Sequence, residues 1–228
     1  MNSEDFLTSW NSLSTFGELH ISKEHIVFFG NQYFQMEQIK KYISKHALLH
    51  QVHGKLVIPS ATTLKKADGH YTSKKKQALI IKTADCMPVM LSSGSQIFGL
   101  HIGWRSLAKK ILTESILHTK TKENINLWVG PHIQQNRFSL DMKSLEELLS
   151  PHKLSIKKAL SLGIIKPSFE QKKHYLVSLK DILLKEAFEC GISNFYSSDI
   201  DTYWSCNHYS HRRNPNRKGT NYSFILKI

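Results

Sequence analysis

The sequence predicts an α+β fold, a single layered domain in which mixed β-sheets are flanked by helices. Short apolar runs such as "ALIIKT" (78–83) are interspersed with amphipathic stretches such as "LKDILLKEAFEC" (179–190), without strict alternation. No linker rich in Pro, Gly or Ser and no internal repeat divides the 228 residues, a length that fits one generous domain. We therefore expect one domain over residues 1–228.

The first half of the chain is expected to be mostly strands. Apolar runs bounded by turn residues are typical of buried strands. A helix is expected over residues 35–49, because Ile39, Tyr42 and Ile43 recur on one helical face. The expected strands are residues 25–29, 55–59, 78–83, 88–93 and 96–102.

The second half predicts more helix. Ser106 is a candidate N-cap for a helix over 107–118, and Ser144 with Glu147 forms a capping-box pattern. A second such pattern, Ser178 with Asp181, precedes the stretch 179–190, which Gly191 is expected to end. Further strands are expected at 125–131, 194–204 and 222–228.

The formal net charge is +13, which favours anionic partners such as nucleic acid, phosphate or a nucleotide-like substrate. The lysines occur as scattered short clusters, typical of a solvated surface, and no nucleic-acid-binding motif accompanies them. Nucleic acid is therefore disfavoured as a partner.

Location is inferred from the N-terminus and the cysteines. The start "MNSEDFLTSW" lacks the basic and apolar regions of a signal peptide, and no apolar run approaches the ~20 residues that cross a bilayer. Three cysteines, none in a C-x-x-C pair, do not complete a disulfide framework. We expect a cytoplasmic protein with reduced thiols and no membrane partner.

Three residues at expected strand ends carry the candidate chemistry: His53, Cys86 and His101. Two imidazoles and one thiolate are good ligands for Zn²⁺, and three protein ligands leave one position open for water, as in catalytic zinc sites. The ordinary alternatives are a buried cysteine that acts as a small hydrophobe and histidines that hydrogen-bond at the surface.

Other polar residues lie near this triple in sequence. Asp85 is expected either to orient a ligand or shuttle a proton, or to bond nearby amides as a turn residue. Arg105 beside an expected helix start predicts an anion site, with a surface ion pair as the alternative. His132 is expected either in the pocket or on a solvated loop. Further phosphate or sugar contacts are expected from Tyr209, Arg212 and Arg213.

The segments "QVHG", "TADCMPVML", "HIGWRS" and "VGPHI" occur in that order over about residues 50–135. They resemble the signatures of the laccase-domain or multicopper polyphenol oxidase family (YfiH-like), whose members are also described as purine nucleoside phosphorylases and peptidoglycan editing factors. A weaker similarity continues in "HYSHRRNPNRKGT". The resemblance implies a YfiH-like fold and a zinc ion bound by His53, Cys86 and His101.

The resemblance also implies an enzyme that acts on purine nucleosides with inorganic phosphate. The implied reactions are phosphorolysis of adenosine, inosine, guanosine or methylthioadenosine, and deamination of adenosine. Cys86, Asp85 and His101 are then expected to be catalytic. Copper is disfavoured because no H-x-H cluster occurs in the sequence. Residues expected to bind substrate or phosphate are Arg105, His132, Tyr209 and Arg212.

Two other functions stay open: a hydrolase acting on peptidoglycan precursors, with Cys86 as nucleophile and His101 as base, and a basic binding protein without turnover. The chain also departs from the family pattern: Ile102 and Ser106 replace smaller residues, and an N-terminal Gly-Gly-x-Ser stretch is missing. The preferred purine and the oligomeric state are not predicted by the sequence.

Overall fold

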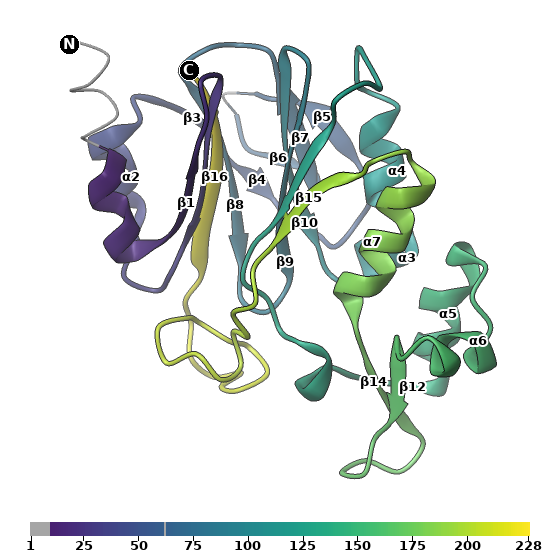
Figure 1. The fold of residues 1–228 in the computed structure, drawn as a ribbon. Helices are drawn as coiled ribbons and strands as arrows, with labels where there is room; N and C mark the ends of the chain where they lie inside the picture. Colours follow the sequence, from purple (N-terminus) through teal and green to yellow (C-terminus); the bar gives the residue numbers. More distant parts are fainter. Residues whose placement is uncertain (1–9, 62) are drawn as a thin grey trace.

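The computed structural model describes residues 10–61 and 63–228, and it confirms the α+β class. Two mixed β-sheets lie against each other, and helices cover their outer faces (Figure 1). Val27 and Leu79 of one sheet and Met90 of the other belong to the same buried apolar cluster, so the inner core lies between the sheets. The described residues thus form four layers.

One sheet has five strands and the other has six, and both combine parallel and antiparallel pairs. In spatial order, the first comprises β1 (Gly17–Ile21), β2 (His25–Gly30), β16 (Asn221–Lys227), β8 (Gln77–Thr83) and β3 (Lys45–Ala47). The second comprises β15 (Asn194–Ser197), β11 (Asn126–Val129), β9 (Met87–Ser93), β10 (Gln96–Ile102), β7 (Gly69–Thr72) and β5 (Val57–Pro59).

Smaller elements complete the layers. An apolar cluster packs α2 (Met36–Tyr42) and the 3₁₀ turn Ser12–Phe16 on the outer face of the five-stranded sheet. The outer face of the six-stranded sheet packs against α3 (Trp104–Ala108), α4 (Ile111–Ile116) and α7 (Leu179–Glu189). The same apolar cluster extends to α5 (Met142–Leu149), which packs against α3, and to α6 (Ile156–Ser161), which lies next to α5 (Figure 1). The short strands β12 (Ser139–Asp141), β14 (His174–Val177) and β13 (Ile165–Pro167) form a third sheet, and β4 (Leu49–His50) pairs with β6 (Lys65–Lys66).

Most of the expected strands are confirmed, but several expected boundaries were wrong; the strand expected over 125–131, for example, is Asn126–Val129. The helix expected over 35–49 ends at Tyr42, because residues 45–47 instead pair in parallel with the edge of β8. The strand expected over 194–204 ends at Ser197 and the one over 55–59 begins at Val57. No helix of residues 10–61 and 63–228 has the length and apolar character needed to cross a bilayer.

The helix expected over 107–118 is in fact two helices. Its N-cap is Gly103 rather than Ser106, which is buried inside α3, and the chain breaks at Lys110 with a left-handed φ of 57°. Glu186 of α7 accepts hydrogen bonds from the Thr113 amide (2.8 Å) and hydroxyl (2.7 Å) in the first turn of α4. A side chain from a helix far away in the sequence therefore provides the hydrogen-bond acceptor that a backbone amide in the first turn of α4 lacks within its own helix.

The capping predictions had mixed outcomes. Asp141, not Ser144, caps α5 by accepting a hydrogen bond from the Ser144 amide at 2.9 Å. Ser178 caps α7 as expected, accepting from the Asp181 amide, and Gly191 follows that helix with a left-handed φ of 77°.

The fold buries a histidine between its sheets, and this predicts acid sensitivity. His70 of β7 is fully buried, and burial lowers its pKa from 6.5 to about 3. The unfolded chain binds more protons between these values, so the free energy of unfolding falls as the pH falls below about 6.5. From pH 7 to pH 5 this one group removes about 2 kcal/mol.

Replacing the ring with an apolar side chain of similar volume should remove that contribution. We expect His70→Leu to lose less stability between pH 7 and pH 5 than the unsubstituted protein does in urea unfolding. Equal losses in the two proteins would contradict the assignment to His70.

Candidate metal centre

Strand register brings the ends of β7, β9 and β10 together at one edge of the six-stranded sheet. In the antiparallel pair of β9 and β10, Ile102 lies opposite Met87, so Cys86 and His101 become neighbours. On the other side of β10, Leu100 lies opposite Gly69 of β7, which places Asp68 beside His101. The turn 84–86 leads from β8 in the first sheet to β9 in the second, so this edge is where the chain crosses between layers.

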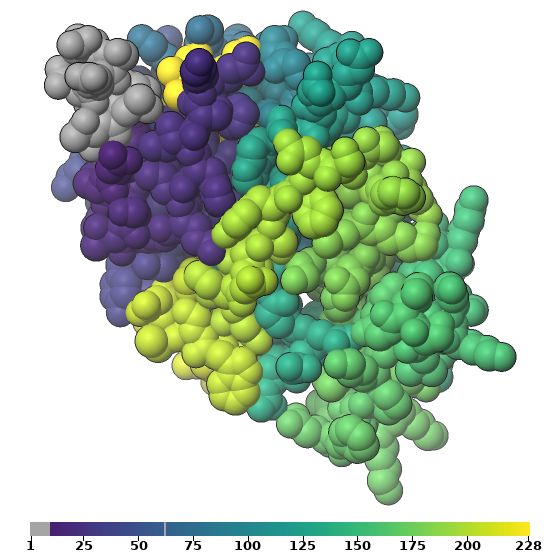
Figure 2. Space-filling view, viewed as in Figure 1, coloured from purple at the N-terminus to yellow at the C-terminus, as the bar shows by residue number. Residues whose placement is uncertain are grey.

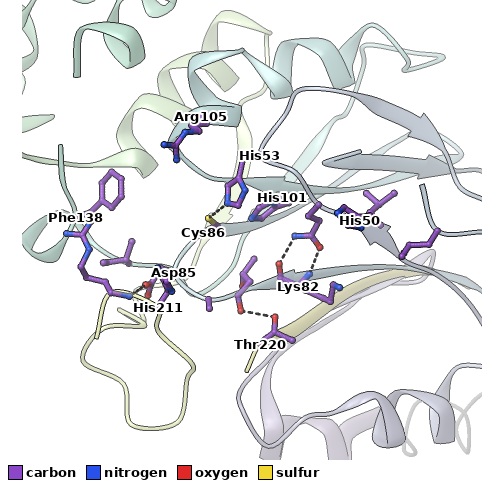
Figure 3. Close-up of a pocket in the computed structure, with 17 residues that line it drawn as sticks. His50, His53, Lys82, Asp85, Cys86, His101, Arg105, Phe138, His211 and Thr220 are labelled. Atoms are coloured by element: carbon purple, nitrogen blue, oxygen red, sulfur yellow. Dashed lines mark hydrogen bonds between the residues drawn. The ribbon is translucent and has the colours of Figure 1, made fainter. Parts of the chain in front are cut away.

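The structure brings the three expected metal ligands into one group. One ligand atom from each of His53, Cys86 and His101 lies within 4.8 Å of the other two. The Cys86 Sγ is 3.8 Å from His53 Nε2, and the two imidazole rings have centroids 4.7 Å apart (Figure 3). His101 is buried, Cys86 is partly buried and His53 is exposed, so the group opens to solvent on one side.

Asp68 is the residue that holds this group in place, and sequence reasoning missed it. Its carboxylate is fully buried and accepts a hydrogen bond from the His101 ring at Nδ1 (2.8 Å). It also accepts from the backbone amides of His53 (2.9 Å) and Gly54 (2.6 Å). Because Nδ1 of His101 is committed to Asp68, Nε2 remains as the ligand atom.

No local signal in the sequence distinguishes Asp68. It stands in "KKADGHY", where Asp-Gly resembles an ordinary turn dipeptide. Its role depends on strand pairing between β7 and β10, which is a tertiary property.

Gly103 leaves the space in which the group assembles. A Cβ added at this position would lie 2.9 Å from Cys86 Sγ and 3.2 Å from a carbon of the His53 ring. A side chain here would therefore push the thiol and the imidazole apart. The glycine of "HIGW" thus allows the close approach of the thiol and the imidazole.

The electrostatics of the group favour a thiolate. Burial by itself raises the pKa of Cys86, but hydrogen bonds and charges from His101 and His53 outweigh burial and lower it from 9.0 to about 6. Burial likewise opposes a charge on His101, yet Asp68 and Cys86 together raise its pKa from 6.5 to about 9. The pKa of Asp68 is lowered because bonds from His101, Gly54 and His53 outweigh its burial.

The donor set fits a metal ion with borderline or soft preferences. A thiolate and two imidazoles suit Zn²⁺ and copper ions, whereas Mg²⁺ and Ca²⁺ prefer oxygen ligands. The exposed side of His53 leaves room for a further ligand.

A cavity of about 670 Å³ opens over the group (Figure 3). Its walls combine basic, apolar and hydroxyl side chains contributed by the ends of β8 and β10 and by the segments after β3, β5, β8, β10, β11 and β15. The lining residues are Leu49, His50, Gln51, His53, Leu64, Lys82, Thr83, Ala84, Asp85, Cys86, His101, Arg105, Ile133, Phe138, His211, Arg212 and Thr220.

Two of the four expected substrate-binding residues line this cavity, and two do not. Arg105 and Arg212 lie in its wall. His132 is buried behind the wall, where its Nδ1 bonds the Gly130 carbonyl at 2.8 Å, and burial lowers its pKa to about 4. Tyr209 is not among the lining residues; the Arg217 guanidinium covers its ring, with the guanidinium carbon 4.9 Å from the ring centroid.

The helix that was expected to begin after Arg105 begins one residue before it, and the anion site expected at Arg105 stays a prediction. The helix α3 has five residues and begins at Trp104, so Arg105 lies within it, its guanidinium 4.4 Å from the Trp104 ring centroid. Sequence reasoning also missed Lys82, His50, His211 and Phe138, which converge only through the fold.

The geometry predicts an unusually acidic thiol. In protein stripped of metal by a chelator, we expect the rate of Cys86 alkylation by iodoacetamide to rise with a midpoint near pH 6, because the thiolate is the nucleophile. In Asp68→Asn, His101 loses the carboxylate that raises its pKa, so this midpoint should rise toward 9.0.

Site-resolved mass spectrometry measures both profiles, and the exposed Cys206 is the internal reference. An unchanged midpoint for Cys86 in Asp68→Asn would contradict the role given to the buried carboxylate.

The chain is similar to several known proteins over most of its length. The chain is 27% identical over 203 residues to purine nucleoside phosphorylase RP494 of Rickettsia prowazekii, which covers 85% of this chain and 82% of that protein. It is 27% identical over 193 residues to purine nucleoside phosphorylase YfiH of Escherichia coli, which covers 81% and 75%.

Among solved structures, Neisseria meningitidis protein NMB0706 superposes with a TM-score of 0.80 at 18% identity, covering 93% of this chain and 98% of that one. YlmD of Geobacillus stearothermophilus gives 0.79 at 17% identity, with the same coverage. These two likenesses establish a shared fold. The family model described as multi-copper polyphenol oxidoreductase laccase matches residues 29–227. Because that match spans most of the chain, the protein belongs to the multi-copper polyphenol oxidoreductase laccase family.

Proposed function

We propose that the protein is a zinc-dependent purine nucleoside enzyme that cleaves nucleosides with inorganic phosphate and deaminates adenosine. One observation carries the proposal: a His-Cys-His group lies at the floor of a cavity that is rimmed by cationic and apolar side chains. Relatives of 27% identity that carry the name purine nucleoside phosphorylase support the substrate class.

In this proposal His53, Cys86 and His101 hold the zinc ion. Bound Zn²⁺ supplies Lewis acidity at neutral pH. Asp68 keeps the His101 ring in one tautomer and holds the His53 loop by backbone bonds, so the three donors stay aligned. The low pKa of Cys86 makes the thiolate available without a strong base.

The cavity walls suit a nucleoside and an anion. Leu49, Leu64 and Phe138 offer apolar surface to a purine ring. Arg105, Arg212 and Lys82 supply positive charge for phosphate. Against these three cationic residues the lining includes one carboxylate, Asp85, whose two oxygens accept hydrogen bonds from the Thr202 hydroxyl and the Arg212 backbone amide.

Phosphorolysis then has a definite atom balance. A phosphate oxygen attacks C1′ of the ribose, and the bond from C1′ to the purine nitrogen breaks. The purine leaves with the bonding electrons and takes up a proton at a ring nitrogen. The cationic wall positions the attacking phosphate, and the apolar wall excludes water that would compete with it.

The same residues support a second candidate, a thiol hydrolase. Asp68, His101 and Cys86 form a carboxylate-imidazole-thiol series, and the pKa of Cys86 is lowered to about 6. In this candidate Cys86 is the nucleophile and no metal is required. Metal content therefore separates the two candidates.

Removing the thiol tests the metal assignment. We expect purified protein to hold about one equivalent of zinc and to release adenine from adenosine only with phosphate, and inosine with or without it. Cys86→Ala should lose both the zinc and all turnover, because two imidazoles alone bind the ion weakly.

Cys206→Ala is the matched control, because this exposed cysteine lies outside the cavity lining. Purified protein that holds no zinc and does not turn over adenosine would favour the thiol hydrolase, and full turnover of adenosine by Cys86→Ala would contradict the zinc proposal.

Removing one cationic side chain tests the phosphate wall. Arg105→Gln should raise the KM for phosphate by roughly 10-fold or more, the usual loss for one charge-assisted hydrogen bond. Deamination, which uses no phosphate, should change far less. Steady-state assays with and without phosphate measure both effects, and an equal loss in the two reactions would contradict a phosphate role.

A further inference from the structure

Asp85 connects the turn at Cys86 to the segment of the chain that follows β15. Its Oδ1 accepts a hydrogen bond from the Thr202 hydroxyl at 2.7 Å, and its Oδ2 accepts from the Arg212 backbone amide at 2.6 Å. The residue is 9% exposed. Both acceptor oxygens are thus committed to residues more than a hundred positions away in sequence.

The backbone of Asp85 makes a third connection. Its carbonyl accepts from the Ile133 amide at 3.0 Å, which ties down another lining residue of the cavity. Its φ is 90°, a left-handed value that is energetically unfavourable for residues other than glycine. This strained conformation aims the carboxylate at the C-terminal segment while the next residue, Cys86, faces the histidines (Figure 3).

The segment that Asp85 holds is internally braced by Arg213. The Arg213 guanidinium donates to the backbone carbonyls of Thr202, Tyr203, Ser205 and His208. These four bonds tie residues 202–213 together, and Figure 2 shows this part of the chain in yellow-green at the lower left of the molecule. Two residues of this unit, His211 and Arg212, line the cavity.

We infer that Asp85 is a positioning residue that fixes the 202–213 segment as a wall of the substrate cavity, rather than a proton shuttle. The inference rests on the proposed function in taking this cavity as the substrate site. Asp85 sets the distance between the three candidate metal ligands and the wall formed by His211 and Arg212. It precedes the ligand Cys86 in the sequence, and its carboxylate accepts a hydrogen bond from the Arg212 backbone amide. Its neighbour Asp68 already performs the other role expected of a carboxylate here, that of orienting a histidine ligand.

A conservative amide substitution separates positioning from proton transfer. In Asp85→Asn the amide oxygen still accepts from the Arg212 amide, and the amide nitrogen donates to the Thr202 hydroxyl oxygen, so both bonds survive without a titratable group. We expect kcat/KM within about 3-fold of the unsubstituted protein and an unchanged pH profile. Asp85→Ala loses both bonds and should raise the nucleoside KM by roughly 10-fold or more, with zinc content unchanged.

Thr202→Val supplies an independent variant, because it removes one of the two bonds without altering the strained turn. Its KM should rise by a smaller factor than that of Asp85→Ala. If Asp85 instead shuttles a proton, Asp85→Asn should lose roughly 100-fold or more in kcat and one limb of the pH profile, while Thr202→Val should be near normal. That pattern would overturn the inference.

Amide hydrogen exchange measures how firmly residues 202–213 are held, and it does not depend on enzyme turnover. Amides of residues 202–213 should exchange faster in Asp85→Ala than in the unsubstituted protein, and at the ordinary rate in Asp85→Asn. Equal exchange in all three proteins would refute positioning. A failure of the proposed function would appear separately, as no nucleoside turnover in the unsubstituted protein.

Discussion

The bond between the buried Asp68 carboxylate and the His101 ring is the interaction on which the candidate site depends. A carboxylate removed from water is costly unless charge and hydrogen bonds compensate it. Asp68 meets that condition with the His101 ring and a row of backbone amides in the His53 loop. One buried charge therefore fixes the tautomer of one candidate ligand and the loop that carries another.

The position of the site follows from how the layers are connected. The chain leaves β8 in the five-stranded sheet and enters β9 in the six-stranded sheet through the turn that holds Asp85 and Cys86. The two sheets end together at this crossing, so segments distant in sequence converge there (Figure 1). Packed sheets on both sides make the crossing rigid, which suits a group whose donors must stay within a few ångströms.

The two aspartates near the site, Asp68 and Asp85, have different roles because they lie in different surroundings. Asp68 is sealed inside the molecule and faces the candidate ligands, whereas Asp85 lies at the cavity edge and faces the 202–213 segment. The positively charged side chains that line the cavity are Lys82, Arg105 and Arg212. The large positive net charge thus has a local counterpart at the site.

The sequence was sufficient to predict the fold class, most strands and the three candidate ligands, because apolar runs indicate buried strands and the segments "QVHG", "TADC" and "HIGW" are short and local. It did not determine where helices break, since the split between α3 and α4 is stabilised by Glu186 from a distant helix. Nor did it reveal Asp68, or separate His132 and Tyr209 from the cavity. Those outcomes depend on strand register and on the course of the segment after β15, which bring together side chains that lie far apart in the sequence.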